Sequence, residues 1–182
     1  MIRRNDVRVG HVNLAKPGSR NSSRFVGIVE ALNCEGLEQH LVLRDRSIAR
    51  QLMPLGGVSI GPVAHTAVTA SCLVPSVDVA HVHDPAAGQA GLILTLTRSI
   101  PYVLTHRGEL PNGRHPLVHA VYRRAAYVIC PDHADVDLLH HFEPGLRVAV
   151  IQETREPAAI HHLVRVYQNS QRIPMAGNNG IQ

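Results

Sequence analysis

The sequence predicts an α/β fold: a doubly wound parallel sheet of about seven strands with helices on both faces. Two observations predict it. Short β-branched runs alternate with amphipathic stretches along the 182 residues, which is the pattern of β-α units joined into a parallel sheet. Runs such as "YVLT", "YVIC" and "VAVI" are apolar throughout, as expected of strands that are covered on both faces.

The first β-α unit lies near the start of the chain. "DVRVGHVNLA" (residues 6–15) predicts a strand, and "SSRFVGIVEALNCEG" predicts a helix with apolar residues at helical spacing on one face. Ser22 or Ser23 is the expected cap, and Gly36 the expected end.

The remaining units repeat this alternation. In chain order the predicted strand and helix pairs are "QHLVLR" with "SIARQLMPLG", "GVSIG" with "HTAVTASCLV", "VDVAHVH" with "GQAGLILTLTRS", "PYVLT" with "HPLVHAVYRRA", "YVIC" with "DHADVDLLHHF", and "LRVAVI" with a helix over residues 156–171. Apolar positions along one side of that last helix predict that it packs back on the domain. We therefore expect one Rossmann-like domain over residues 1–172 and a flexible tail over 173–182.

Composition limits the class of protein and its partners. Three cysteines without motif spacing predict no disulfide framework and a reducing cytosol. The chain starts without an apolar run of signal-peptide length and has no window near the ~18 apolar residues of a membrane span. We expect a cytoplasmic protein. The net charge of +4 favours phosphate-bearing partners or peripheral contact with an anionic membrane at its inner face. Aromatic residues are 3% of the chain and tryptophan is absent, so no nucleic-acid partner is expected.

Ligands of doubly wound sheets bind outside the carboxyl ends of the strands. Four loops reach that edge: residues 16–23, 83–89, 106–114 and 131–135. Backbone N–H groups at a helix start suit an anion, although the first loop is equally explained as a solvated cap. The candidate ligand-binding residues are Lys16, Gly18, Ser19, Arg20, Ser22, His83, Asp84, Arg107, Gly108 and Asp132.

Motifs for bound cofactors are absent, because the sequence has neither a G-x-G-x-x-G nor a G-x-x-x-x-G-K-[ST] motif. His81 and His83 are two apart on a predicted strand, so their side chains share one face and could ligate a metal with Asp84 or Asp132. The alternative is a hydrogen-bonded histidine in the core, which is commoner inside a covered sheet. We expect no metal and no resident cofactor.

The order of the motifs resembles the N-terminal domain of family 4 retaining glycosyltransferases, which contain two Rossmann-like domains. "VAHVHDP", "IPYVLTHRG" and "YRRAAYVICPDHA" occupy, in order, the places of that family's His-x-His strand, its "PxVxTxHG" strand and its "R-x-A-D-x-V-I-x-x-S" strand and helix. The likeness spans residues 7–151. Together with the strand and helix alternation, it implies the strand order 3-2-1-4-5-6-7 with "VDVAHVH" in the centre.

The resemblance is uneven at the residues that carry the family's chemistry. Aligning Thr105 with Gly108 puts Arg107 where the family has a histidine beside the transferred sugar, with His106 one residue early. A one-residue slip on a strand reverses the face, so the two are not interchangeable. Gly18 with Ser19 replaces a glycine pair in the first loop, and Pro131 or Asp132 replaces a serine. The family's second, donor-binding domain is expected to be missing, since the sequence continues for few residues after "RVAVI".

These expectations lead to a glycosyltransferase-like single-domain protein of bacterial cell-surface polysaccharide or lipopolysaccharide biosynthesis. It would bind an acceptor glycan, a sugar phosphate or a partner transferase, and a nucleotide sugar is a further candidate ligand. The alternatives are an active glycosyltransferase completed by a homodimer or a partner chain, or a small metal-dependent hydrolase using His83, His106 and Asp84. The candidate catalytic residues are His106, Arg107 and His83. Whether the protein is an enzyme stays open, because the second domain would supply the groups that stabilise a leaving diphosphate.

Overall fold

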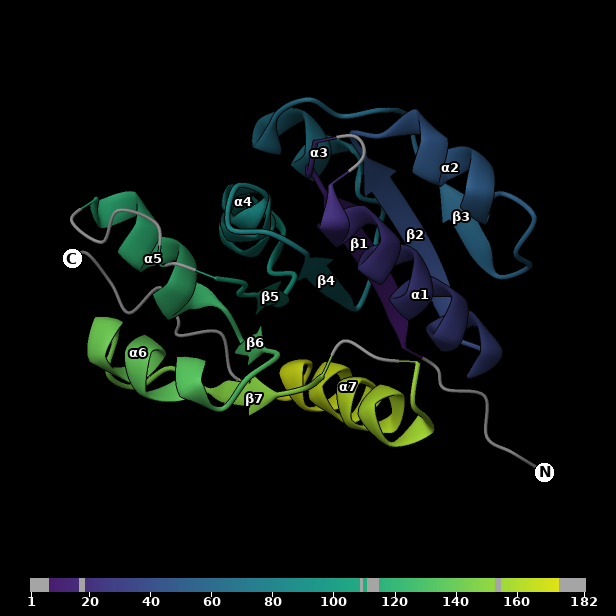
Figure 1. Ribbon diagram of the computed structural model, residues 1–182. Helices are drawn as coiled ribbons and strands as arrows, with labels where there is room; N and C mark the ends of the chain where they lie inside the picture. The colour runs from purple at the N-terminus through teal and green to yellow at the C-terminus, as the bar shows by residue number, and fades with distance from the viewer. Residues whose placement is uncertain (1–6, 17–18, 109, 111–114, 153–154, 174–182) are drawn as a thin grey trace.

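Figure 1 shows the computed structural model, which describes residues 7–16, 19–108, 110, 115–152 and 155–173. Seven parallel strands form one sheet in the order β3-β2-β1-β4-β5-β6-β7. The strands are β1 (Arg8–Asn13), β2 (Glu38–Leu43), β3 (Val58–Ile60), β4 (Val79–Val82), β5 (Tyr102–Thr105), β6 (Tyr127–Cys130) and β7 (Val148–Val150). The predicted fold class, strand order and central place of "VDVAHVH" are confirmed.

A helix follows each strand. The helices are α1 (Arg20–Cys34), α2 (Arg46–Leu52), α3 (Ala67–Leu73), α4 (Gly88–Arg98), α5 (Pro116–Arg124), α6 (Ala134–Phe142) and α7 (Pro157–Ser170). Of the helices in the described residues, none is long and apolar enough to cross a membrane.

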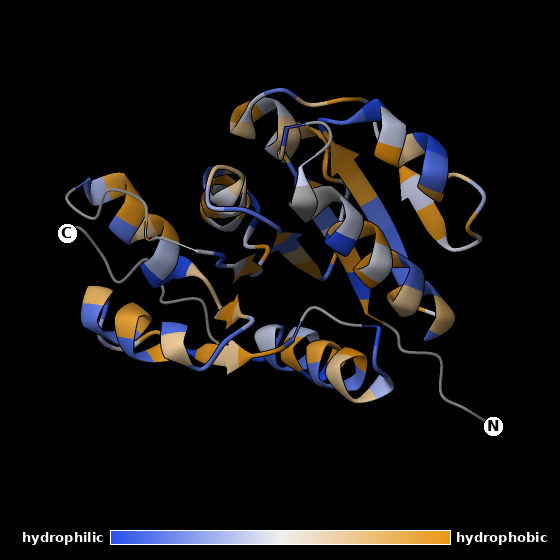
Figure 2. Cartoon of the chain, viewed as in Figure 1, coloured by the Kyte–Doolittle hydropathy of each residue, from blue (hydrophilic) through white to orange (hydrophobic). Residues whose placement is uncertain are grey.

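The helices form a layer on each face of the sheet. The helices α1, α2 and α7 pack on one face, and α3, α4, α5 and α6 on the other. Figure 1 shows α4 and α7 on opposite sides of β4 and β5. Neighbouring residues of β5 divide accordingly, with Val103 in the core below α7 and Leu104 in the core below α4 and α5. This alternation explains the apolar strand sequences, which Figure 2 shows most clearly in β6 and β7.

The start of α1 differs from the prediction. The helix begins at Arg20, and Ser19 takes the N-cap position with an extended backbone, φ −68° and ψ 152°. Serine is a common cap residue, but this segment has three of them, so the residue type alone does not select the cap. The predicted end is close: the last helical residue is Cys34, and Gly36 has the positive φ of 76° that favours glycine after a helix.

The helix α7 packs on the same face of the sheet as α1. Five of its apolar side chains are buried against the sheet and α1: Ile160, Leu163, Val164, Val166 and Tyr167. At the rim, Arg155 forms an ion pair with Glu30 of α1 at 2.7 Å. The last helix of the fold therefore covers the same face as the first.

Candidate functional site

The sheet changes winding direction between β1 and β4. The chain leaves β1 for α1 on one face and leaves β4 for α4 on the other, so the two loops separate at the carboxyl edge. A crevice of this kind is where ligands bind in doubly wound sheets. The loops after β1, β4 and β5 bring Lys16, Asp84 and Arg107 to it.

Arg107 is anchored at this edge by its own side chain. Its Nη1 donates a hydrogen bond of 2.7 Å to the backbone oxygen of His83, directly after β4. The side chain is half-buried. Its positive charge also acts on its neighbours, since it helps to lower the pKa of His83 and opposes the rise in the pKa of Asp84.

Asp84 is held by backbone groups. Its Oδ1 accepts the N–H of Ala87 at 2.7 Å, and its Oδ2 accepts the N–H of Leu14 at 3.2 Å. Burial raises the pKa of Asp84, and these two hydrogen bonds oppose the rise. The carboxylate thus fastens the loop after β4 to the end of β1, a function that the sequence alone does not reveal.

His106 and Arg107 point to different sides of the sheet. The N–H of His106 extends the ladder by donating to the oxygen of Ile129 at 2.8 Å, and its Nδ1 lies 2.9 Å from the hydroxyl of Tyr122 in α5. His83 lies on the α1 face, beside Phe25. The structure therefore places the imidazoles of His83 and His106 on opposite faces of the sheet, because side chains alternate along a strand, and does not bring the two together with Asp84.

The other predicted ligand-binding residues are more scattered. Lys16 is exposed at the end of β1, and Gly108 is exposed with a φ of 74°, a turn that favours glycine. Asp132 is exposed and its Oδ1 accepts the N–H of Ala134 at 3.0 Å, at the start of α6. Ser19 caps α1. Gly18 and the side chains of Arg20 and Ser22 lie outside the described residues.

Below this edge three histidines cluster on the α1 face: His11, His81 and His83. His11 of β1 is in register with His81 of β4, and His83 lies two residues further. The rings of His81 and His83 are 3.8 Å apart between centroids, and the side chains share a face as predicted. The sequence analysis missed His11, and the structure brings it to the cluster in place of Asp84 or Asp132.

Hydrogen bonds hold the cluster together. His11 Nδ1 lies 2.9 Å from His83 Nε2. His81 is bound on both sides, with its Nδ1 2.6 Å from the hydroxyl of Tyr167 in α7 and its Nε2 2.7 Å from that of Thr105 in β5. The network therefore joins three neighbouring strands of the sheet to the last helix.

Burial keeps these imidazoles neutral. All three are at most 1% exposed. Loss of hydration lowers the pKa of His11 to about 3 and the pKa values of His81 and His83 well below the ordinary range. The amide of Gln39 beside His11 opposes that shift, although the two groups do not meet in hydrogen-bonding geometry. Neutral imidazoles have a lone pair available for a proton or a metal ion.

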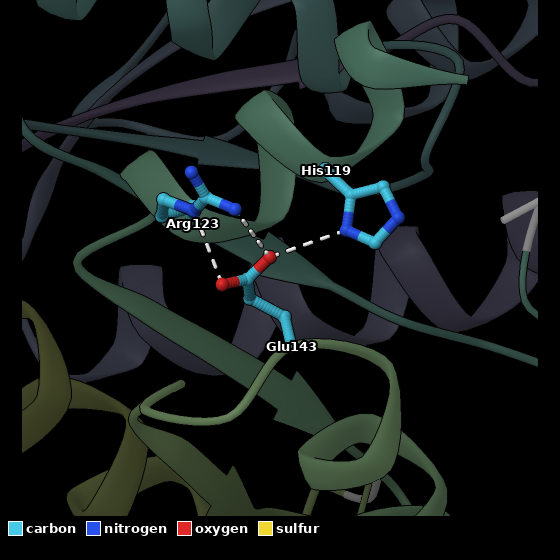
Figure 3. A network of polar contacts seen from close by, with 3 residues as sticks. All are labelled: His119, Arg123 and Glu143. Carbon is cyan, nitrogen blue, oxygen red and sulfur yellow. Dashed lines mark hydrogen bonds and ion pairs between the residues drawn. The ribbon is translucent and has the colours of Figure 1, made fainter. Parts of the chain in front are cut away.

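A second polar network lies at the surface, away from this edge. Glu143, just after α6, accepts hydrogen bonds of 3.1 Å from the Nε and Nη2 of Arg123 in α5, and lies 3.2 Å from the Nδ1 of His119 (Figure 3). The Arg123 guanidinium is the main cause that lowers the pKa of Glu143. His119 also stacks on Phe142, with ring centroids 4.3 Å apart. This network joins α5 to the end of α6.

No protein-family model matches the chain, and no curated protein matches it in sequence. Solved structures do match it in fold. HepE (Alr3699) of Anabaena in complex with UDP-glucose matches with a TM-score of 0.60 and 14% identity, over 81% of this chain and 44% of HepE. HepE with UDP and glucose gives a TM-score of 0.57 at the same identity and coverage. HepE with UDP alone gives 0.56 over 80% of this chain.

These likenesses show that the chain shares the Rossmann-like α/β fold of HepE. The chain spans less than half the length of HepE.

Proposed function

We propose that this chain is a glycosyltransferase-like module that binds a phosphate-bearing sugar at the carboxyl edge between β1 and β4. The position of Arg107 carries the proposal, because its guanidinium is held at the winding switch by the His83 backbone oxygen. A guanidinium presents several N–H donors in a fork that matches a phosphate. Lys16 adds a second, exposed cation after β1.

The ligand that fits this edge best is a nucleotide sugar or a sugar phosphate. HepE, which shares the fold, is in complex with UDP-glucose in one solved structure and with UDP in another. We carry the ligand class to this chain as part of the proposal, with Asp84 and Gly108 shaping the loops around the phosphate. The same proposal includes membership of glycosyltransferase family 4, a single domain over residues 1–172, and action on an acceptor glycan or with a partner transferase in bacterial surface polysaccharide synthesis.

A second candidate is an active glycosyltransferase whose site is completed by a second copy or a partner chain. The supporting observation is that the likeness extends over 44% of HepE. The site would then lie between this edge and the partner.

The net charge of +4 supports contact with an anionic membrane from the cytoplasmic side.

Calorimetric titration with UDP-glucose, UDP and glucose 1-phosphate tests the proposal. We expect Arg107→Ala to weaken binding of a phosphate-bearing ligand by about 10- to 100-fold, because a hydrogen bond to a charged group contributes about 1.5–3 kcal/mol. Lys16→Ala should weaken it by less, because an exposed cation is screened by solvent.

The matched control is Arg147→Ala, which removes an exposed arginine just before β7, at the opposite edge of the sheet. This variant should bind as the native chain does. Equal losses in the Arg107 and Arg147 variants would indicate a diffuse charge effect and contradict a site at this edge. Absence of binding by the native chain to all three ligands would reject the phosphate-bearing sugar altogether. Hydrolysis or transfer of UDP-glucose by the isolated chain would instead favour an enzyme that needs no partner.

A further inference from the structure

The buried histidine cluster lies below the edge that holds the proposed sugar site, and its hydrogen bonding is incomplete. A neutral imidazole has one N–H and one lone pair. The contact between His11 Nδ1 and His83 Nε2 uses one N–H and one lone pair, whichever ring donates. The two remaining nitrogens, His11 Nε2 and His83 Nδ1, are buried and make no hydrogen bond to described residues. One N–H and one lone pair therefore remain without a hydrogen-bond partner among the described residues, which is unfavourable inside a protein.

We propose that His11, His81 and His83 form a site for one divalent transition-metal ion, with Zn²⁺ as the best fit. One nitrogen from each ring lies within 4.8 Å of the corresponding nitrogens of the other two. Around a tetrahedral Zn²⁺ with Zn–N distances of about 2.0–2.1 Å, ligand nitrogens are about 3.4 Å apart. The His11 Nδ1 to His83 Nε2 distance of 2.9 Å is slightly shorter. Rotation of the two rings would open this pair of nitrogens to the spacing of zinc ligands.

The scaffold around the cluster favours a fixed site. His11 and His81 face each other across paired strands, so their spacing is set by the ladder of β1 and β4. His81 has hydroxyl neighbours on both ring nitrogens, Tyr167 and Thr105. When one nitrogen of His81 turns to the metal, the other donates its N–H to one of these hydroxyl oxygens. Such outer contacts fix the tautomer of metal-binding histidines.

Charge defines the fourth ligand. Three neutral imidazoles leave the ion with its full charge, and the positive charge of Arg107, which already lowers the pKa of His81 and His83, opposes a buried cation. A negatively charged fourth ligand such as hydroxide offsets both. Imidazole ligands suit Zn²⁺, Co²⁺ and Ni²⁺, and disfavour Ca²⁺ and Mg²⁺.

Cobalt titration of the chelator-stripped full chain tests the site. We expect Co²⁺ to bind in a 1:1 ratio with the intense visible absorption of a tetrahedral centre, and an excess of Zn²⁺ to displace it. Zinc should also raise the thermal midpoint of the native chain. His83→Asn should abolish the 1:1 absorption, with far-UV circular dichroism to show that the variant is folded. His141→Ala, which changes an exposed histidine of α6, should leave it intact.

X-ray absorption of the zinc-loaded native chain tests the same site without a variant. Three imidazole ligands at about 2.0 Å are expected. Three results would overturn the proposal. The first is a cobalt spectrum of octahedral type, and the second is a metal-to-protein ratio that falls when a surface histidine such as His141 is replaced. The third is a folded His83→Asn chain that binds the metal as the native chain does. If His83→Asn does not fold, the X-ray absorption spectrum of the zinc-loaded native chain decides. Fewer than two imidazole ligands in that spectrum would reject the site.

Discussion

The two faces of the central strands are equally buried but carry different chemistry. Towards α3–α6, β1 and β4 present Val12 and Val82, which are paired in register and 0% exposed. Towards α1 and α7, the adjacent pair in the same two strands is His11 and His81, also at most 1% exposed. Burial alone therefore does not determine composition in this sheet. At this pair one face is stabilised by apolar contact, and the other adds neutral imidazoles with hydroxyl partners to its own apolar core.

Because of this difference, the two faces contribute to stability in different ways. The valine pair under α3–α6 has no titratable group, so its contribution to stability is the same across the pH range. The histidine face depends on the protonation state of its rings, and on α7, which supplies the Tyr167 hydroxyl to His81. Three changes test the contrast, from the largest expected effect to the smallest.

Removal of α7 should have the largest effect. We expect a chain that ends at Gln152 to lose cooperative unfolding in urea, because five buried side chains of α7 contribute about 1.5–3 kcal/mol each. Whole domains are stable by only about 5–15 kcal/mol. A chain that ends at Ile173 is the control, since it keeps α7 and should unfold at the native midpoint. An unchanged midpoint after removal of α7 would mean that the histidine face does not need its cover.

Acid should weaken the histidine face next. The unfolded rings titrate near their ordinary pKa of about 6.5, whereas burial lowers the pKa of His11 to about 3 and those of His81 and His83 well below 6.5. Below pH 6.5 the unfolded chain therefore binds more protons, and stability, which is complete above that pH, falls as the pH drops. Each ring contributes about 1.4 kcal/mol per pH unit.

Urea unfolding with EDTA at pH 7.5, 6 and 5 measures this slope. His81→Gln should reduce the slope of the free energy of unfolding against pH by the contribution of about one proton. Leu104→Ala, on the apolar face, should lower the free energy of unfolding by about 2–5 kcal/mol at every pH and leave the slope unchanged. A pH-independent native chain would show that the rings are charged, or exposed, in the folded state.

The smallest effect is expected at the surface network of Figure 3. Glu143→Gln removes a carboxylate that pairs with Arg123, whose side chain is 67% exposed. Exposed pairs contribute about 0–1 kcal/mol, so we expect a change below about 1 kcal/mol in the free energy of unfolding. A double-mutant cycle with Arg123→Gln isolates the pair. A coupling above 2 kcal/mol would place this network among the main supports of the fold.

Much of the fold follows from local sequence. The alternation of apolar runs with amphipathic stretches sets the seven β-α units, and the all-apolar runs identify strands buried on both faces. Strand alternation also places His81 and His83 on one face and separates His106 from Arg107. The cap of α1 was misplaced because the segment has three serines, and Ser19 takes the N-cap position with an extended backbone and no side-chain cap hydrogen bond.

The site depends on information that is not local. His11 joins the cluster because β1 pairs with β4 in one register, and the trace of this in the sequence is that "VGHV" and "VAHV" are identical at three of four positions. Asp84 is an acidic residue at a strand end, as a ligand-binding residue would be. Its oxygens, however, accept backbone N–H groups from Leu14 and Ala87, which no motif specifies.

The hydrogen bond between His81 and Tyr167 joins residues 86 positions apart. A ribosome adds about 5–20 residues per second, so His81 is synthesised roughly 4–17 s before its hydroxyl partner exists. Over that interval α1 has been synthesised, but α7, the other helix that covers the histidine face, has not. Translation therefore leaves this chain with an open apolar and imidazole surface until its last helix is made, and a chaperone that shields such surfaces would act in that window.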